Sequence, residues 1–167
     1  SFTITEKGYS LSGSDGGYYP SVLEDFQNGP ESPESFMGKV SSLCYERYRA
    51  GRLPLAWVSM DNCSRNGEKI QNAIRTFAVE WAKRGLVDSG FPDYVDNPEK
   101  TSFPWSMIDK ITPRPDPAIK AMLESEGFED TEIICTAKKT YAAPFVNSER
   151  PQYLVIEDAF PNGRPPL

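Results

Sequence analysis

Two polar side chains, Asn62 and Asp109, occupy positions at which an α/β protein could bind a small molecule. Asn62 follows a nearly continuous apolar run at residues 53–60, and Asp109 stands toward the end of a second expected strand at residues 106–111. Parallel sheets bind ligands beyond the carboxyl ends of their strands, so both side chains could lie at one such edge. A simpler role stays open for each. Asn62 could be a turn residue that orients the next helix, and Asp109 could pair with Lys110.

Other residue types with reactive side chains give fewer options. The chain contains no histidine, which excludes Ser-His-Asp catalysis, Cys-His catalysis and histidine-ligated zinc within it. The wide spacing of Cys44, Cys63 and Cys135 favours buried thiols in a reducing compartment over disulfides or a thiolate metal site. Glu157 and Asp158 are adjacent carboxylates, but neighbours on a strand point to opposite faces, so we interpret the pair as structural. We expect no metal.

Composition limits the class of protein. A chain of 167 residues with 38% apolar content can form one globular domain, and its 15 prolines and 12 glycines indicate many short connections. The net charge of −6 without a basic run argues against a nucleic-acid partner. No stretch approaches the roughly 20 apolar residues of a membrane span. We expect a cytoplasmic protein, and the opening without methionine predicts a piece of a longer chain.

The elements that must position Asn62 and Asp109 follow from hydrophobic patterning. Strands are predicted at residues 2–5, 53–60, 106–111, 132–137 and 153–156. Helices are predicted to begin near Ser32-Pro33, near Asn66 and at Asp116-Pro117. Residues 12–20 are predicted as a loop and residues 87–104 as a surface excursion. Alternating strands and helices are typical of an α/β fold with parallel pairing and helices on the sheet faces.

Two of the predicted helices carry an expected core face. In the helix that follows Asn66, apolar residues recur at helical spacing and predict one buried stripe, made of Ile70, Ala73, Ile74, Phe77, Ala78, Trp81 and Ala82. In the helix that follows Asp116, we expect Ala118, Ile119 and Met122 to face inward, and Gly127 to end the helix.

Four sequence blocks occur in an order that resembles a known family. They are residues 3–9 (TITEKGY), 59–62 (SMDN) with 66–67 (NG), 103–113 (FPWSMIDKITP), and 155–158 (VIED) with 163–165 (GRP). In this order they resemble the signatures of the mannitol dehydrogenase family of long-chain polyol dehydrogenases, which also includes fructuronate reductases (mannonate oxidoreductases) and tagaturonate reductases. Lys110 departs from a common arginine, and residues 87–102 and 127–146 look longer than in compact members.

The resemblance implies a fold and a division into domains. Members combine an N-terminal dinucleotide-binding domain with a C-terminal helical domain, and they work without zinc. Residues 1–167 are then the C-terminal portion of the Rossmann-type domain, a partial Rossmann-like α/β fold with a mainly parallel sheet and flanking helices. The family's glycine-rich turn would precede Ser1, and its catalytic lysine lies in a helical-domain motif that contains a histidine. We therefore expect this chain to need the N-terminal and C-terminal parts of its own polypeptide and to be inactive alone.

The resemblance also implies roles for particular residues. Asn62 matches an asparagine that contacts the reacting oxygen, and Asp109 matches an aspartate beside substrate and nicotinamide. Thr5, Glu6 and Lys7 would contact NAD or NADP, although a lysine after an edge strand is more often solvated. An amide N–H aimed at an oxygen that gains negative charge typically stabilises the transition state by ~3 kcal/mol.

The sequence therefore predicts part of an NAD(P)-dependent oxidoreductase. The reaction would interconvert a keto-sugar or keto-uronate and its polyol or aldonate, with fructuronate/mannonate favoured over fructose/mannitol. The alternative is a non-catalytic α/β binding or interaction module derived from a dehydrogenase. A glycine-rich turn upstream and a Lys/Asn/His motif downstream in the reading frame would favour the enzyme.

Overall fold

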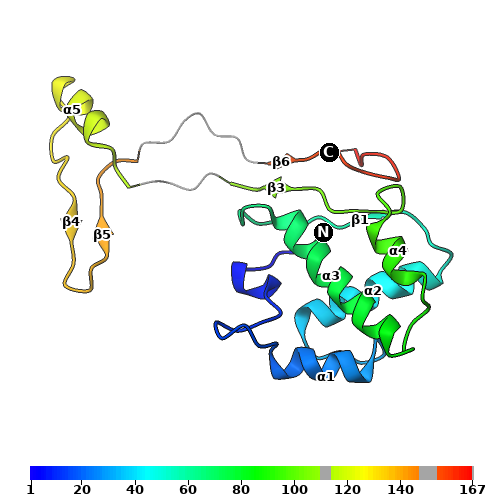
Figure 1. Cartoon of the computed structure of the whole chain (residues 1–167). Coiled ribbons are helices and arrows are strands. Elements are labelled where there is room, and N and C mark those ends of the chain that lie inside the picture. Colours follow the sequence, from blue (N-terminus) through cyan, green and yellow to red (C-terminus); the bar gives the residue numbers. More distant parts are fainter. Residues whose placement is uncertain (110–113, 147–153, 167) are drawn as a thin grey trace. The chain divides into compact units, whose positions relative to one another are not determined.

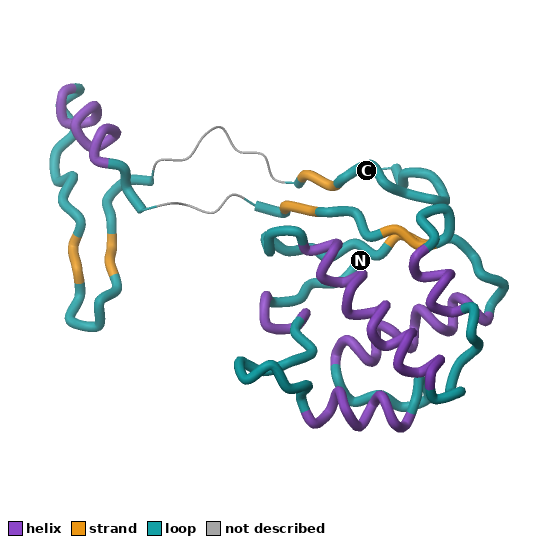
Figure 2. Tube along the Cα trace, in the orientation of Figure 1, coloured by secondary structure: helices purple, strands orange, loops and turns teal. Residues whose placement is uncertain are grey.

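A computed structural model describes residues 1–109, 114–146 and 154–166. The chain divides into a first unit, Ser1–Ile108 with Leu154–Leu167, and a second unit, Asp109–Tyr153. In chain order the described elements are η1 (Glu6–Tyr9), α1 (Pro20–Asn28), α2 (Phe36–Arg49), β1 (Leu55–Ala56), α3 (Asn66–Lys83), α4 (Phe91–Asp96), β2 (Thr101–Ser102), β3 (Ser106–Met107), α5 (Pro117–Ser125), β4 (Ile134–Cys135), β5 (Tyr141–Ala142) and β6 (Val155–Ile156). Helices dominate the first unit, and every strand is short (Figure 2).

Helix α3 is the centre of the first unit's core. It packs against α1, α2 and α4 (Figure 1). The predicted stripe from Ile70 to Trp81 is buried, and Ala82 packs against it, so this prediction is confirmed. Phe77 meets Phe26 of α1 with ring centroids 4.8 Å apart, and the Trp81 indole donates a 2.8 Å hydrogen bond to the carbonyl oxygen of Asp25. The sharpest pattern in the sequence therefore marks the helix that organises the core.

Parallel pairing occurs among three segments of the first unit. β1 pairs with β2 in parallel, and Phe2 forms a parallel bridge with Ser59. The Phe2 amide donates to Val58 O at 3.1 Å, and the Met60 amide donates to Phe2 O at 2.7 Å. The predicted strands at residues 2–5 and 53–60 thus meet in parallel at the Phe2–Ser59 bridge. Their carboxyl ends reach the same edge.

The rest of the described pairing is antiparallel, so the prediction of a mainly parallel sheet is wrong. β3 pairs with β6 and β4 pairs with β5, both antiparallel. The chain leaves the first unit through β3 and returns through β6, and these two strands run in opposite directions. A short turn joins β4 to β5, and so short a link permits only antiparallel pairing. Of the predicted strands, residues 110–111 and residue 153 lie outside the described residues.

Helix α2 begins three residues later than the sequence predicts. Ser35, not Ser32, is the N-cap, and its hydroxyl accepts a 3.1 Å hydrogen bond from the Gly38 amide. The buried Asp25 carboxylate explains the shift, because it accepts hydrogen bonds from the amides of Glu34 at 2.8 Å and Ser35 at 2.9 Å and so holds the turn before the helix. Asp25 belongs to α1, a helix that the sequence analysis did not predict.

Residues 87–104 are not the predicted surface excursion. They contain α4 and β2, and Phe91, Tyr94 and Val95 of α4 are buried in the core. The three apolar residues occupy positions i, i+3 and i+4 and therefore share one helix face. The Tyr94 hydroxyl also donates a 2.8 Å hydrogen bond to Leu53 O, which fixes the chain just before β1. Burial of three large side chains outweighs the many Pro, Gly and Asp residues around them.

The second unit combines α5 with the β4–β5 hairpin. Asp116 caps α5 as predicted, with its carboxylate accepting from the Ala118 amide at 2.7 Å, and Gly127 follows with a positive φ of 85°. The predicted inward face is wrong, because α5 has no buried residue and Met122 is 47% exposed. Among the described residues, the second unit offers this nine-residue helix only a two-stranded hairpin as a partner, which is too small to cover one of its faces.

The cysteines are free and differ in burial. Cys44 is fully buried, Cys63 is half-buried and Cys135 is exposed, so the prediction of buried thiols is correct only for Cys44. Burial raises the pKa of the Cys44 thiol to about 12, since the thiolate is poorly solvated in an apolar core.

This raised pKa predicts a loss of stability in alkali. A group whose folded pKa is raised stabilises the protein fully below its unfolded pKa, and this stabilisation disappears as pH rises toward the folded pKa. Between pH 9 and 12 the free energy of unfolding should therefore fall by about 1.4 kcal/mol per pH unit through Cys44 alone. Urea denaturation at several pH values should show a shallower decline for Cys44→Val than for the wild type. Parallel curves would contradict the assignment.

Candidate active site

Polar side chains from three chain segments meet at the carboxyl edge of the parallel pairing. Residues 2–5 lead into η1, β1 leads through Ser59 to Asp61 and Asn62, and β2 leads to Ser106. This is the edge at which α/β sheets bind ligands. Asn62 therefore follows the end of β1 at this edge, and its role there stays a prediction.

Asn62 is half-buried, and its amide has a defined orientation. Its Oδ1 accepts a 2.9 Å hydrogen bond from the Ile108 amide. It does not cap α3, which starts at Asn66 after Arg65 in a left-handed conformation. With Oδ1 fixed on Ile108, the plane of the amide is set, and Nδ2 carries two N–H donors. Such a group can donate to an oxygen atom of a ligand.

Asn66 plays a different part from the predicted helix cap. It is fully buried as the first residue of α3, and its Oδ1 accepts from the amides of Gly67 at 2.9 Å and Ser106 at 3.0 Å. Its Nδ2 donates to Ser106 Oγ at 2.9 Å, to Ser106 O at 3.1 Å and to Asp61 O at 3.3 Å. No local sequence pattern indicates this connection, although Asn66-Gly67 is among the residues that carry the resemblance.

Asp61 is the centre of a second cluster, which the sequence analysis also missed. The hydroxyls of Tyr9 and Ser59 both donate to its carboxylate and lie 2.6 Å from each other, and the Cys63 amide donates to it at 2.7 Å. Burial alone would raise the pKa of Asp61, but hydrogen bonds from Ser59, Tyr9 and Cys63 outweigh it and lower the pKa. Burial and the contact with Asp61 raise the pKa of Tyr9. Asp61 is therefore an anion that holds the edge together, not an acid that exchanges protons near neutral pH.

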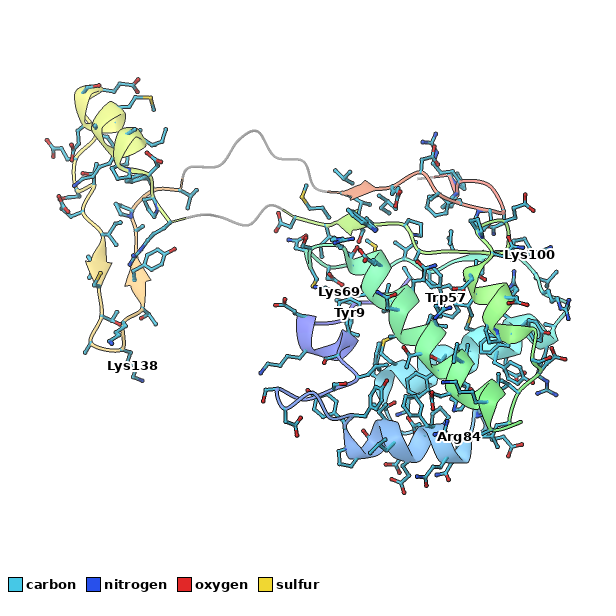
Figure 3. All side chains as sticks on the ribbon, viewed as in Figure 1. Tyr9, Trp57, Lys69, Arg84, Lys100 and Lys138 are labelled. Atoms are coloured by element: carbon cyan, nitrogen blue, oxygen red, sulfur yellow. The ribbon has the colours of Figure 1, made fainter. Side chains whose placement is uncertain are left out.

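A cavity of about 500 Å³ opens beside this cluster. It is lined by Glu6, Tyr9, Ser10, Leu11, Ser12, Tyr18, Lys69, Asn72, Ala73 and Thr76. Tyr9 and Lys69 lie near each other at this edge (Figure 3), and Lys69 Nζ contacts Cys63 Sγ at 2.8 Å. Of the residues predicted to contact a cofactor, Glu6 lines the cavity, while Thr5 and Lys7 are exposed next to it in the chain. The volume is in the range of small-molecule pockets.

Asp109 is exposed and is the first residue of the second unit. Its convergence with Asn62 stays a prediction. The residue before it, Ile108, is the one whose amide Asn62 binds. Lys110, with which Asp109 could form an ion pair in the simpler interpretation, lies outside the described residues.

Within residues 1–109, 114–146 and 154–166, no three or more side chains of His, Cys, Asp and Glu gather in a way that could hold a metal ion. Over those same residues, none of the helices combines the length and apolar character needed to cross a bilayer.

Comparison with known families identifies this arrangement. The family model described as the mannitol dehydrogenase Rossmann domain matches residues 1–167. The chain belongs to the mannitol dehydrogenase family. In this chain, the part that matches the family's Rossmann domain has small sheets with both parallel and antiparallel pairing.

Individual members of the mannitol dehydrogenase family agree with this assignment. The chain is 55% identical over all its 167 residues to the D-mannonate oxidoreductase of Thermotoga maritima, and covers 31% of that protein. It is 32% identical to the polyol:NADP oxidoreductase of Gluconobacter oxydans, and again covers 31% of it. The solved ternary complex of Pseudomonas fluorescens mannitol 2-dehydrogenase with NAD and D-mannitol matches 98% of the chain at 28% identity, with a TM-score of 0.54 and 30% of that protein covered.

Proposed function

We propose that the chain is part of an NAD(P)-dependent oxidoreductase that interconverts mannonate and fructuronate. The observation that carries the substrate class is the 55% identity with a D-mannonate oxidoreductase, against 32% with a polyol:NADP oxidoreductase, over comparable lengths. Mannitol and fructose are the next pair. Because the chain spans about 30% of its relatives' length, the activity belongs to the full-length polypeptide, of which we assign residues 1–167 to the C-terminal portion of the dinucleotide-binding domain.

Asn62 is the residue to which we give the main chemical role in this chain. When the ketone is reduced, negative charge accumulates on its oxygen, and an amide N–H already aimed at that oxygen stabilises the charge without reorganisation. The hydrogen bond from Ile108 to Asn62 Oδ1 supports this role, because it fixes the amide before substrate arrives. Asp109 would help to place the substrate. A lysine outside this chain would transfer the proton.

The cofactor contacts that we propose lie at residues 5–7. A nicotinamide cofactor would supply or accept the hydride. The cavity that Glu6 lines supports this proposal, and the exposed Lys7, next in the chain, would add a cation. The start of α3 does not fit its pyrophosphate, because a Cβ at Gly67 would lie 2.0 Å from Phe103 O, so backbone already covers that helix end. The phosphate-binding turn would therefore belong to another part of the polypeptide.

Assays of the full-length protein test this function. With NADH or NADPH, we expect kcat/KM for fructuronate to exceed that for fructose by at least roughly 100-fold, since a site built to bind a polar group rejects substrates that lack it. Tagaturonate, which is also a keto-uronate, serves as the control for the carboxylate. A preference for fructose would support the mannitol reaction instead. No turnover with any of the three would favour the non-catalytic module.

A further inference from the structure

We propose that Asn66 is a positioning residue that sets the orientation of the Asn62 amide. The proposal rests on the proposed function, because that function gives Asn62 its role at the reacting oxygen. The Asn66 side chain is fully buried, and both its oxygen and its nitrogen are hydrogen-bonded. A buried polar side chain with its groups satisfied fixes the arrangement of the segments that it joins.

The first segment that Asn66 holds is the loop after β1. Its Nδ2 donates a 3.3 Å hydrogen bond to the carbonyl oxygen of Asp61. That oxygen belongs to the peptide group that precedes Asn62, so a shift of this peptide rotates the Asn62 side chain.

The second segment is β3. The Ser106 amide donates a 3.0 Å hydrogen bond to Asn66 Oδ1, and Asn66 Nδ2 donates a 3.1 Å hydrogen bond to the Ser106 carbonyl oxygen. Two residues further along, the Ile108 amide binds Asn62 Oδ1. The loop after β1 and strand β3, which Asn66 connects, are therefore connected a second time by the hydrogen bond between Ile108 and Asn62. Because a misplacement of about 1 Å can cost roughly 100-fold in rate, this connection should matter for catalysis.

The isosteric variant Asn66→Asp tests this positioning. It keeps an acceptor for the amides of Gly67 and Ser106 but replaces the donor that faces Asp61 O, Ser106 O and Ser106 Oγ. In the full-length enzyme we expect kcat to fall roughly 10- to 100-fold while KM changes by less than about 3-fold. In an Asn62→Ala background the same change should have little further effect, because the two residues act as one unit. Independent, multiplicative losses would overturn the proposal.

Hydrogen exchange of the Ile108 amide gives a readout that does not depend on activity. We expect faster exchange at Ile108 in Asn66→Asp and unchanged exchange in Ser102→Ala. The control removes the hydroxyl of Ser102 in β2, which donates a 2.6 Å hydrogen bond to Ala159 O. Unchanged exchange at Ile108 in Asn66→Asp would overturn the proposal. A protein without dehydrogenase turnover would remove the proposed function, while the exchange rates would still decide whether Asn66 holds this contact.

If Asn66→Asp fails to fold, Ser106→Ala provides a second test. It removes only the hydroxyl that accepts from Asn66 Nδ2 and donates to Ser59 O. We expect smaller changes in kcat and in Ile108 exchange, in the same direction. No change in either would count against the proposal.

Discussion

Asn62→Ala in the full-length enzyme should lower kcat/KM by about 100- to 1,000-fold, with little effect on the folded structure. This is the usual effect of removing one donor from an oxyanion site. The side chain is half-buried, and losing its hydrogen bond with the Ile108 amide should cost about 1 kcal/mol of stability, the typical value of one hydrogen bond. Steady-state kinetics with fructuronate and thermal unfolding of the same preparations would measure both effects.

Two further variants separate donation from structure. Asn62→Asp keeps an acceptor for the Ile108 amide but loses the N–H donors, so its kcat/KM should fall about as far as that of the alanine variant. Asn97→Ala is the matched control, because the Asn97 amide also accepts from a backbone N–H, that of Glu99 at 2.9 Å, in an exposed turn away from the edge. If Asn62→Asp retained full activity, donation by this side chain could not be part of the mechanism.

Gly67→Ala should lower the free energy of unfolding by about 3 kcal/mol, at the upper end of the usual cost of overpacking. The added Cβ would lie 2.0 Å from Phe103 O and 2.9 Å from the Trp105 ring, and a backbone carbonyl cannot move away cheaply. Alanine's better helix propensity recovers only about 1 kcal/mol. Because α3 holds the core together, the whole first unit should lose stability, which chemical denaturation would detect.

Gly17→Ala is the control for Gly67→Ala. A Cβ at Gly17 would make ordinary contacts with Asp15, the nearest at 3.6 Å, in an exposed loop. Its stability should stay within about 0.5 kcal/mol of the wild type. Equal stabilities of the two variants would show that the close approach of α3 to Phe103 is relaxed in solution.

The sequence predicted those features that local patterning determines. The stripe of α3 is visible because seven apolar residues recur at helical spacing, and the apolar run before Asn62 marks the strand that carries it. The N-cap of α5 is equally local, since Asp116-Pro117 contains its own signal. The family resemblance came from short blocks in a fixed order, and the match over residues 1–167 confirms it.

Other features depended on contacts that no local pattern reveals. α4 is short and lies among Pro, Gly and Asp residues, so its three buried side chains looked like part of a loop. The start of α2 depends on Asp25, which lies ten residues before Ser35. Asn66 looked like an ordinary helix cap, because its contacts with Ser106 span 40 residues of sequence. Antiparallel pairing of β3 with β6 likewise joins segments that are far apart in the chain.

The pairing of β3 with β6 has an evolutionary consequence. Ser106 opposes Ile156 and Met107 opposes Val155, so the polypeptide departs for the second unit and comes back at adjacent points of one ladder. The ladder itself does not fix how long the chain between these points must be. A relative in which this length differs would therefore keep the sheet edge that carries Asn62 unchanged.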